Sequence, residues 1–474
     1  MKTLYRFLTA GMLMSASAFT PVASAQPPDT LWTRTYGSAS EEECNEVIQT
    51  TDGGFLLVGS AASNMWLVKT NANGDWLWHS TNGGDQADVG VAVLQTGDSE
   101  YLVGGTTSSY GNGWEDWWMV KVEGSGYVPW HRTFGDTLSD ILQDIQPTDD
   151  GGYVLAGLKV SYPNGYDMWV VKTDMWGYPV WDQTFGSANT EWAFAVEQTS
   201  DGGYVVAGLA NNGANALLVK TDANGDSLWS RIYDLGRQFR SVHQTGDGGF
   251  ILAGVTNSAG QSDFWLLKTN SNGDLQWSRT YGGSGDDVCF SMQPTADGGY
   301  VLAGWTVSFG AGGKDWWVVK TDANGDSLWS QAFGGLNHDV CNSVQQTDDG
   351  GYVLAGYTNS FGAGGADMWL VRLETELGAG EPERAAVRHF ELHDGYPNPF
   401  NATITISFDV PKTSAVKLEV FDVTGRRVAV LADGVYAAGE HRYVFDASGL
   451  PSGVYLYRLQ AEGFAQTKKM VLLK

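Results

Sequence analysis

Cysteine is scarce in this chain of 474 residues, which contains only Cys44, Cys289 and Cys341. A small exported domain that depends on disulfides needs many more cysteines, so we exclude a disulfide scaffold and expect a large hydrophobic core to carry the stability. Each cysteine lies eight residues before the Asp of a recurring Asp-Gly-Gly turn, where other copies have Gly, Leu, Ala or Phe. This position predicts buried packing residues.

Basic residues are also scarce, with 28 Lys and Arg against 54 Asp and Glu and a formal net charge of −26. Because no basic patch interrupts this acidic composition, we expect no nucleic-acid partner and no attraction to an anionic membrane.

Long apolar runs are absent after the first residues of the chain. Lys2 and Arg6 precede an apolar run that ends in Ala23-Ser24-Ala25. This order predicts a secretory signal peptide over residues 1–25, cleaved near Ala25, and a mature chain that is exported and not inserted into a membrane.

No set of catalytic residues emerges from the sequence. It contains neither a metal-spaced histidine pair nor a nucleophile elbow, and His79 and His131 occupy the same place in their repeats. An active site usually requires one or two repeats to diverge sharply, whereas these are close to identical. We therefore expect no enzyme and no cofactor, with Ca²⁺ as the one cation to consider.

Internal repetition is the strongest positive feature of the sequence. The phrase "TDDGGYVLAG" occurs at 148–157 and again at 347–356, and five variants of it complete a series of seven. The matching glycines are 45 to 53 residues apart, a spacing typical of propeller blades. They are Gly59, Gly104, Gly157, Gly208, Gly254, Gly304 and Gly356.

Each repeat is expected to form four short β-strands. In the unit at 287–334, four runs rich in aromatic and β-branched residues are separated by glycine-containing turns. The chain begins with an unassigned fourth-strand element, "LWTRTYG" at 31–37, and the seventh unit stops after "DMWLVRLE" at 367–374 without one. We predict an all-β fold, a seven-bladed β-propeller over residues 26–374 whose N-terminal strand closes the last blade. The unit broadly resembles kelch and WD repeats without their specific signatures.

The predicted turns distinguish two faces of the propeller. The Asp-Gly-Gly and Asn-Gly turns are tight and lie on one face. The longer loops, such as "NSFGAGGAD" at 359–367, lie on the opposite face, together with aromatic residues such as Trp114 and Tyr166. We expect binding on this longer-loop face, with glycan as a reasonable ligand class.

After a polar linker at 375–393, the composition changes. Residues 394–474 contain alternating segments that predict about seven strands in a small sandwich of immunoglobulin type. Several of its motifs resemble the C-terminal sorting domain of type IX secretion cargo, which implies transfer across the outer membrane of a Gram-negative bacterium by the secretion machinery. A plain Ig-like stalk is the alternative. The residues that carry the resemblance are Pro397, Asn398, Pro399, Phe400, Gly453, Tyr455, Lys468 and Lys469.

One candidate site is a repeated acidic position ten residues before the Asp of each Asp-Gly-Gly turn. Six of its seven members are acidic, and the seventh is Arg237. If the first strand is innermost, these carboxylates would ring one mouth of the central channel and hold Ca²⁺ or a polyhydroxylated ligand. Alternatively, each acid caps its own strand by accepting hydrogen bonds from nearby backbone N–H groups. The six are Glu42, Asp88, Asp140, Glu191, Asp287 and Asp339.

A second candidate is the loop Asp-Ala-Asn-Gly-Asp, which occurs twice and offers oxygen ligands at alternate positions. Its glycine is fourth, unlike that of an EF-hand, and other repeats fill the same turn with unrelated residues. Its Asp and Gly are also spaced unlike those of a sialidase Asp box. A β-hairpin turn is the competing interpretation. The residues concerned are Asp222, Asn224, Asp226, Asp322, Asn324 and Asp326.

Two functions follow from the sequence. The first is a secreted or cell-surface binding or structural module, adhesin-like, with a glycan or a surface protein as its partner. The second is an extracellular polysaccharide hydrolase or lyase that uses the carboxylates of the channel mouth.

Overall fold

A computed structural model describes residues 27–161, 165–256, 261–375, 390–393, 395, 398–412, 414–436, 439–461 and 463–473, so the predicted signal peptide lies outside it. The chain divides into two compact units, Met1–Glu376 and Leu377–Lys474. Strands dominate both units, and the single helical turn among the described residues is η1 (Asn211–Gly213). None of the described helical segments is long and apolar enough to cross a membrane.

The first unit consists of four-stranded antiparallel sheets, seven of them in the described part of residues 27–375. The apolar runs form strands because they are too short for helices and are separated by turns in which glycine adopts positive φ. The first strands of the sheets are β2 (Glu42–Gln49), β6 (Asp88–Gly97), β10 (Asp140–Pro147), β14 (Trp192–Gln198), β18 (Gly236–Gln244), β22 (Asp287–Pro294) and β26 (Asp339–Gln346). The second strands are β3 (Phe55–Ala61), β7 (Glu100–Thr107), β11 (Tyr153–Ser161), β15 (Tyr204–Ala210), β19 (Phe250–Thr256), β23 (Tyr300–Thr306) and β27 (Tyr352–Thr358).

The third and fourth strands complete each sheet. The third strands are β4 (Asn64–Thr70), β8 (Asp116–Glu123), β12 (Gly165–Thr173), β16 (Asn215–Thr221), β20 (Phe264–Thr269), β24 (Asp315–Thr321) and β28 (Asp367–Leu373). The fourth strands are β5 (Trp76–Asn82), β9 (Trp130–Phe134), β13 (Pro179–Phe185), β17 (Ser227–Tyr233), β21 (Leu275–Tyr281), β25 (Ser327–Phe333) and, from the start of the described chain, β1 (Thr30–Tyr36).

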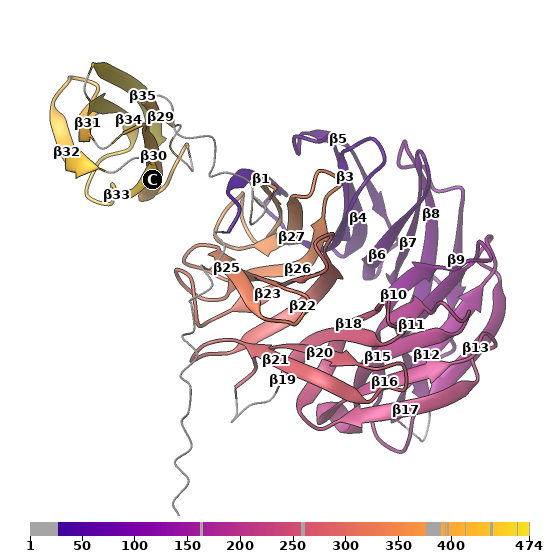
Figure 1. Ribbon diagram of the computed structural model, residues 1–474. Helices are drawn as coiled ribbons and strands as arrows, with labels where there is room; N and C mark the ends of the chain where they lie inside the picture. Colours follow the sequence, from indigo (N-terminus) through magenta and orange to yellow (C-terminus); the bar gives the residue numbers. More distant parts are fainter. Residues whose placement is uncertain are drawn as a thin grey trace, which may run out of the picture. The chain divides into compact units, whose positions relative to one another are not determined.

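The N-terminal strand completes the last sheet. β1 pairs antiparallel with β28, with Arg34 opposite Leu370 and Tyr36 opposite Met368, and the sheet order is β1-β28-β27-β26. The pairing predicted from the complementary ends of the chain is therefore confirmed. In Figure 1 the indigo β1 accordingly lies among the orange strands of this sheet.

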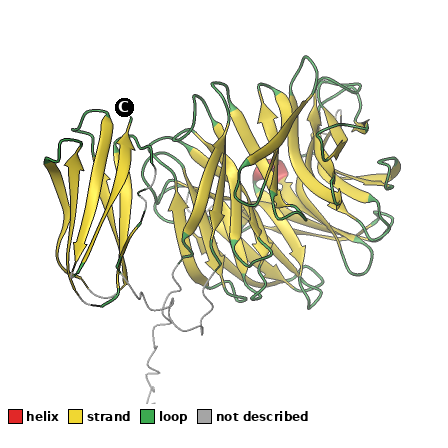
Figure 2. Ribbon diagram, turned by 90° about the horizontal axis from the view of Figure 1, so that it is seen from above, coloured by secondary structure: helices red, strands yellow, loops and turns green. Residues whose placement is uncertain are grey.

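Hydrophobic cores lie between neighbouring sheets, and the first strands lie at the centre. Each described core cluster of the first unit combines residues of two adjacent sheets, and one of them joins the last sheet to the first through Val353, Leu370, Phe55 and Val68. The first strands of neighbouring sheets contact one another, including β2 with β26. Figures 1 and 2 show the sheets arranged around a common axis, which is the architecture of a β-propeller with repeated blades.

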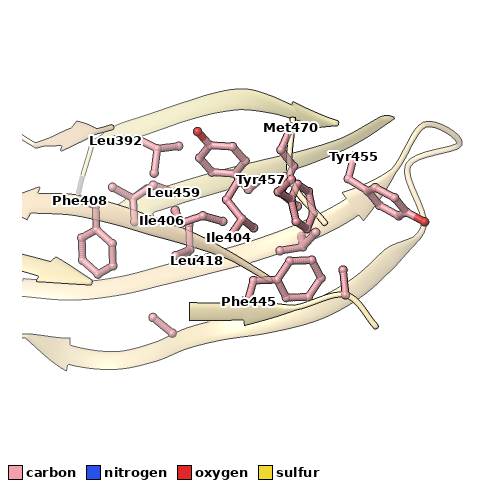
Figure 3. Close-up of a cluster of buried hydrophobic side chains, with 14 of the residues drawn as sticks. Leu392, Ile404, Ile406, Phe408, Leu418, Phe445, Tyr455, Tyr457, Leu459 and Met470 are labelled. Atoms are coloured by element: carbon pink, nitrogen blue, oxygen red, sulfur yellow. The ribbon is translucent and has the colours of Figure 1, made fainter. Parts of the chain in front are cut away.

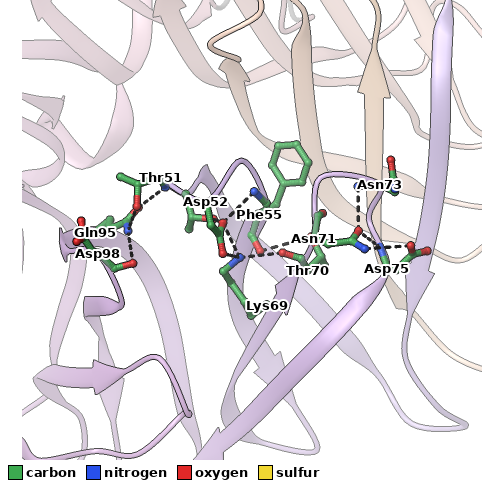
Figure 4. Close-up of polar contacts among 12 residues, drawn as sticks. Thr51, Asp52, Phe55, Lys69, Thr70, Asn71, Asn73, Asp75, Gln95 and Asp98 are labelled. Carbon is green, nitrogen blue, oxygen red and sulfur yellow. Dashed lines mark hydrogen bonds and ion pairs between the residues drawn. The ribbon is translucent and has the colours of Figure 1, made fainter.

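A buried lysine in the third strand holds the Asp-Gly-Gly turn. In the first sheet, the Lys69 ammonium lies 2.9 Å from the Asp52 carboxylate and donates to the Thr70 carbonyl at 2.8 Å (Figure 4). Asp52 also accepts hydrogen bonds from the Thr50 hydroxyl at 2.6 Å and the Gly54 N–H at 2.9 Å. The equivalent pairs in other sheets are Lys172–Asp150, Lys220–Asp201, Lys268–Asp247, Lys320–Asp297 and Arg372–Asp349.

The second sheet departs from this arrangement. Its turn is degenerate, and Lys121 pairs with Glu100 at 2.9 Å instead. Asp98 stands in this turn, where only its backbone carbonyl is seen to accept a hydrogen bond, from Gln95 (Figure 4).

The three cysteines are free and completely buried, as predicted from their place in the repeat. Burial raises the pKa of the Cys289 thiol to about 12 and raises that of Cys44 and Cys341 as well. These thiols are packing residues of low reactivity.

The second unit is a sandwich of two antiparallel sheets. One has the order β29-β30-β33 and the other β32-β31-β34-β35. Alternate side chains of both sheets meet in one core, which includes Ile406, Phe408, Leu418, Tyr457 and Leu459 (Figure 3). The strands are β29 (Glu391–Leu392), β30 (Thr403–Val410), β31 (Ser414–Asp422), β32 (Arg427–Tyr436), β33 (Gly439–Asp446), β34 (Gly453–Ala461) and β35 (Phe464–Leu472).

The turn carboxylates make the stability of the first unit depend on acid pH. The hydrogen bond from Thr148 and the ammonium of Lys172 lower the pKa of Asp150 to about 2. The folded pKa is thus below the value of about 4 expected in the unfolded chain. This contribution to stability is present above pH ~4 and is lost as the pH falls toward ~2.

We expect Asp150→Asn to lower the free energy of unfolding at neutral pH by about 1–2 kcal/mol, because the buried Lys172 loses its anionic partner. The variant should also lose part of the acid dependence seen in urea unfolding between pH ~4 and ~2. Asp98→Asn is the matched control, since the lysine of that sheet pairs with Glu100. An equal loss of unfolding free energy in Asp150→Asn and Asp98→Asn would show that the Lys172–Asp150 pair does not stabilise the turn.

Candidate functional site

The six acids predicted to ring the channel mouth are instead buried at the entry to the first strands. All six accept a hydrogen bond from the backbone N–H of the residue four positions earlier, at 2.8 to 3.0 Å. The acids are Glu42, Asp88, Asp140, Glu191, Asp287 and Asp339, with exposed fractions of 0 to 4%. Their carboxylates therefore cap the loops that lead into the first strands.

Most of the second carboxylate oxygens are bonded as well. Asp339 accepts from the Ser360 hydroxyl at 2.7 Å and from the Thr358 hydroxyl, and Asp88 makes the same bonds to Ser109 and Thr107. Burial raises the pKa of Asp140 to about 6. None of the six acids is among the residues that line the central cavity, and the alternative in which each acid caps its own strand describes their contacts.

The central cavity has a volume of about 500 Å³ and is lined by all seven first strands. Each of these strands has a β-bulge in its pairing with the second strand, for example between Cys44 and Glu46. A bulge places two successive side chains on one side of the strand, and here both positions line the cavity. We call the bulged residues the bulge ring. They are Asn45, Val91, Gln143, Phe194, Arg240, Phe290 and Asn342.

The residue after the bulge joins adjacent sheets in most of the repeats. Its side chain accepts a hydrogen bond from the backbone of the next sheet in five of the seven places. The distances run from 2.5 Å for Glu46 with the Val93 N–H to 3.3 Å for Ser343 with the Val47 N–H, which joins the last sheet to the first. Asp144 makes the same bond to the Val196 N–H at 2.8 Å.

Charged side chains give the cavity its electrostatic character. Burial, together with the nearby Asp144, raises the pKa of Glu46 to about 8, and burial raises the pKa of Asp144. Glu197 contacts the His243 ring at 3.0 Å. Burial lowers the pKa of Arg240 to about 10, so its guanidinium is still charged at neutral pH.

Sequence reasoning missed the cavity residues because a strand with strict alternation would not present two neighbours to one side. A signal was nevertheless present. The bulge position holds Asn, Val, Gln, Phe, Arg, Phe and Asn in the seven repeats, so Arg240 is the one charged residue among them. A residue whose charge differs from that of all its equivalents in near-identical repeats is a candidate for function.

The two Asp-Ala-Asn-Gly-Asp loops are hairpin turns whose first aspartate is bonded within the turn. Asp222 accepts from the N–H groups of Asn224 and Asp226 at 2.8 and 2.9 Å. Asp322 makes the same bonds to Asn324 and Asp326, both at 2.8 Å. These contacts support the hairpin interpretation over the cation loop.

The turn glycine explains the sequence of this loop. Gly225 has a φ of +83°, and a Cβ there would lie 2.7 Å from the Trp181 ring of the preceding sheet.

The described residues hold one group of three potential metal ligands, Glu391, His393 and Asp409 in the second unit, where His393 lies 3.1 Å from Asp409.

Aromatic residues occupy the longer loops between second and third strands. Trp114 is 80% exposed and Tyr166 is 46% exposed. Tyr110 and Phe309 pack against the third-strand tryptophans at ring distances of 5.4 and 5.1 Å, and thereby anchor their loops. Trp114 occupies the position that is Gly313 and Gly365 in the equivalent loops of later repeats.

The residues of the predicted sorting motif lie close together in the second unit. The Asn398 amide donates to the Lys469 carbonyl at 3.0 Å and accepts from the Val471 N–H at 2.9 Å. Phe400, next to Pro399, is buried and exchanges backbone bonds with the last strand, while the Tyr455 hydroxyl donates to a carbonyl at 2.8 Å. Gly453 begins β34, and Lys468 and Lys469 lie on β35. Pro397 lies outside the described residues.

The comparison with protein families gives one match. Residues 395–473 match the family described as secretion system C-terminal sorting domain. The resemblance noted in the sequence is thereby confirmed, and this domain indicates sorting for export to the cell surface or secretion. The comparison with curated proteins gave no match.

Several solved structures are similar to the chain at low sequence identity. PorZ, a surface component of the type-IX secretion system of Porphyromonas gingivalis, has a TM-score of 0.42 and 12% identity over 90% of this chain and 58% of its own. The chain thus spans less than two thirds of PorZ. YCF48 bound to D1 peptide has a TM-score of 0.43 and 12% identity over 75% of this chain and 99% of its own. A protein of unknown function from Dyadobacter fermentans has a TM-score of 0.41 and 12% identity over 73% and 99%.

We expect Asp339→Ala to lower the free energy of unfolding by about 2–3 kcal/mol, because Ser360, Thr358 and the Gly335 N–H lose a buried acceptor. Arg237→Ala, at the equivalent but exposed position, should change it by less than about 0.5 kcal/mol. Added calcium should leave the melting temperature of the parent protein unchanged. If calcium instead raises the melting temperature and Asp339→Ala abolishes this rise, the six acids would have to form a cation site.

Proposed function

We propose, from the premise that the sorting domain directs this chain to the cell surface or out of the cell, that residues 26–374 are a seven-bladed β-propeller acting there as an adhesin-like binding module. Seven four-stranded sheets and the pairing of β1 with β28 support this proposal. Residues 1–25 would be the signal peptide, 375–393 the linker and 394–474 an Ig-like sandwich that contacts the secretion machinery.

The exposure of Trp114 is the observation that carries the binding role. The indole stands at a loop position where two later repeats have Gly313 and Gly365, and four fifths of the residue faces solvent. Nothing in the repeat requires a large apolar ring there, and exposed tryptophan is enriched where proteins bind their partners. A flat aromatic face can stack on the apolar face of a sugar ring, so we propose glycan as the ligand.

Tyr166 extends the same proposal to the next sheet. It is the second residue of β12 and is 46% exposed. Two exposed rings in neighbouring sheets, Trp114 before β8 and Tyr166 near the start of β12, would allow a glycan chain to contact more than one sugar-binding position.

Cleavage of polysaccharide is less well supported. A glycosidase needs one carboxylic acid to protonate the leaving group and one free carboxylate. The carboxylates from which this activity was inferred are engaged with their own loops.

We expect Trp114→Ala to weaken glycan binding by at least about tenfold, since truncating an exposed aromatic anchor removes its stacking contact. The measurement is a glycan array probed with the exported protein, with and without a calcium chelator. Trp176→Ala is the matched control, because Trp176 is 57% exposed but lies in a turn between third and fourth strands. Equal loss in both variants, or no glycan retained by the parent protein, would count against this site.

A further inference from the structure

Arg240 is a cation inside the central cavity without an anionic partner. No described carboxylate forms an ion pair with it, whereas the other basic residue of the cavity, His243, contacts Glu197 at 3.0 Å. With the Gln238 amide turned so that its oxygen faces Arg240, this oxygen accepts from Nε and from a terminal nitrogen at 3.0 and 3.1 Å. A neutral amide does not compensate the charge, so the half-buried guanidinium has no counter-ion among the described residues.

Two aromatic rings hold the guanidinium in place. Its central carbon lies 3.9 Å from the ring centroid of Phe194 and 5.3 Å from that of Phe290, which belong to the sheets on either side. Both rings occupy the bulge position of their own strands. Cation–π contacts offset part of the desolvation and fix the planar group without using all its N–H donors.

The fold does not require an arginine at this position. The same bulge position holds a neutral residue in all six other repeats. The hydrogen bond to the next sheet is accepted by the neighbouring residue, Ser241, from the Met292 N–H. A half-buried charge that is absent from every other repeat and whose contacts with the neighbouring sheets are to aromatic rings is better explained by a ligand than by stability.

Apart from Val91, the rest of the bulge ring is polar. Asn45 and Asn342 each donate through Nδ2 to a carbonyl of the next sheet at 2.8 Å, which leaves their side-chain oxygens to accept from a ligand, and Gln143 supplies a third amide at the same level of the cavity. Amides can donate to and accept from hydroxyl groups, and the volume of about 500 Å³ is within the range of small-molecule sites.

Two of the three acids that line the cavity leave room for an anion, and the third, Glu197, contacts the His243 ring at 3.0 Å. Glu46 and Asp144 each use a carboxylate oxygen to join adjacent sheets. Because the pKa of Glu46 is raised to about 8, this side chain is mostly protonated at neutral pH, and the pKa of Asp144 is raised in the same direction. The repulsion that these two groups exert on a bound anion is correspondingly reduced.

We propose that the central cavity binds a small hydroxylated carboxylate, such as a sugar acid, whose carboxylate pairs with the Arg240 guanidinium. The side-chain oxygens of Asn45 and Asn342 and the amide of Gln143 hydrogen bond its hydroxyl groups, and Phe194 and Phe290 form the apolar walls. This site is separate from the exposed tryptophan of the longer-loop face and does not depend on glycan binding there.

The test is isothermal titration of the exported full chain with glucuronate, glucose and sulfate. We expect glucuronate to bind at least about tenfold more tightly than glucose, because only glucuronate pairs with the guanidinium. Sulfate should bind more weakly than glucuronate, since it lacks the hydroxyl groups that the amides recognise. Absence of glucuronate binding, or sulfate binding as tight as that of glucuronate, overturns the proposal.

Substitutions then assign the binding to Arg240. Arg240→Met fits between the two rings without the charge and should reduce glucuronate affinity at least about tenfold. Arg240→Lys retains the charge without the planar fork, so its affinity for glucuronate should lie between those of the parent and of the methionine variant. This variant keeps the proposal testable if Arg240→Met does not fold. Arg237→Met, on the same strand but exposed, should bind as the parent does. Unchanged affinity in a folded Arg240→Met contradicts the proposal.

Discussion

The pairing of β1 with β28 is the contact on which the rest of the first unit depends. It joins the two ends of the repeat array, so the last sheet gains its fourth strand from the start of the described chain. Without this pairing, β28 would expose an unpaired edge and the core between the last and first sheets would lose Tyr36. The same junction is reinforced near the axis, where Ser343 accepts from the Val47 N–H and Gln345 from the Gln49 N–H.

Side chains at the centre of the propeller have divided tasks. The residue after each bulge joins neighbouring sheets in five of the seven places, and two members of the bulge ring, Asn45 and Asn342, do so as well through the Gly90 and Cys44 carbonyls. The other bulge positions can therefore differ between near-identical repeats without changing these contacts. Arg240 is at one of them, so its charge does not disturb the hydrogen bonds between sheets.

Much of the fold could be predicted from the sequence because its causes are local. Glycines at positive φ, short apolar runs and the unmatched elements at the two ends indicated the strands and the pairing of β1. The buried cysteines followed from their repeat position. The candidate site was harder, because the direction of Glu42 or Asp339 depends on the loop that each carboxylate caps. Arg240 was missed because a bulge interrupts the alternation by which inward residues are counted.

Hydrogen exchange of the backbone amides in β1 tests the joining of the two ends most directly. The account predicts that the protection factors of the β1 amides are within about tenfold of those of β25, a fourth strand in the interior of the chain. It also predicts that each of these strands exchanges together with the sheet that it completes. Fast exchange of β1 while β28 remains protected would contradict it, because the last sheet would then be stable without the N-terminal strand.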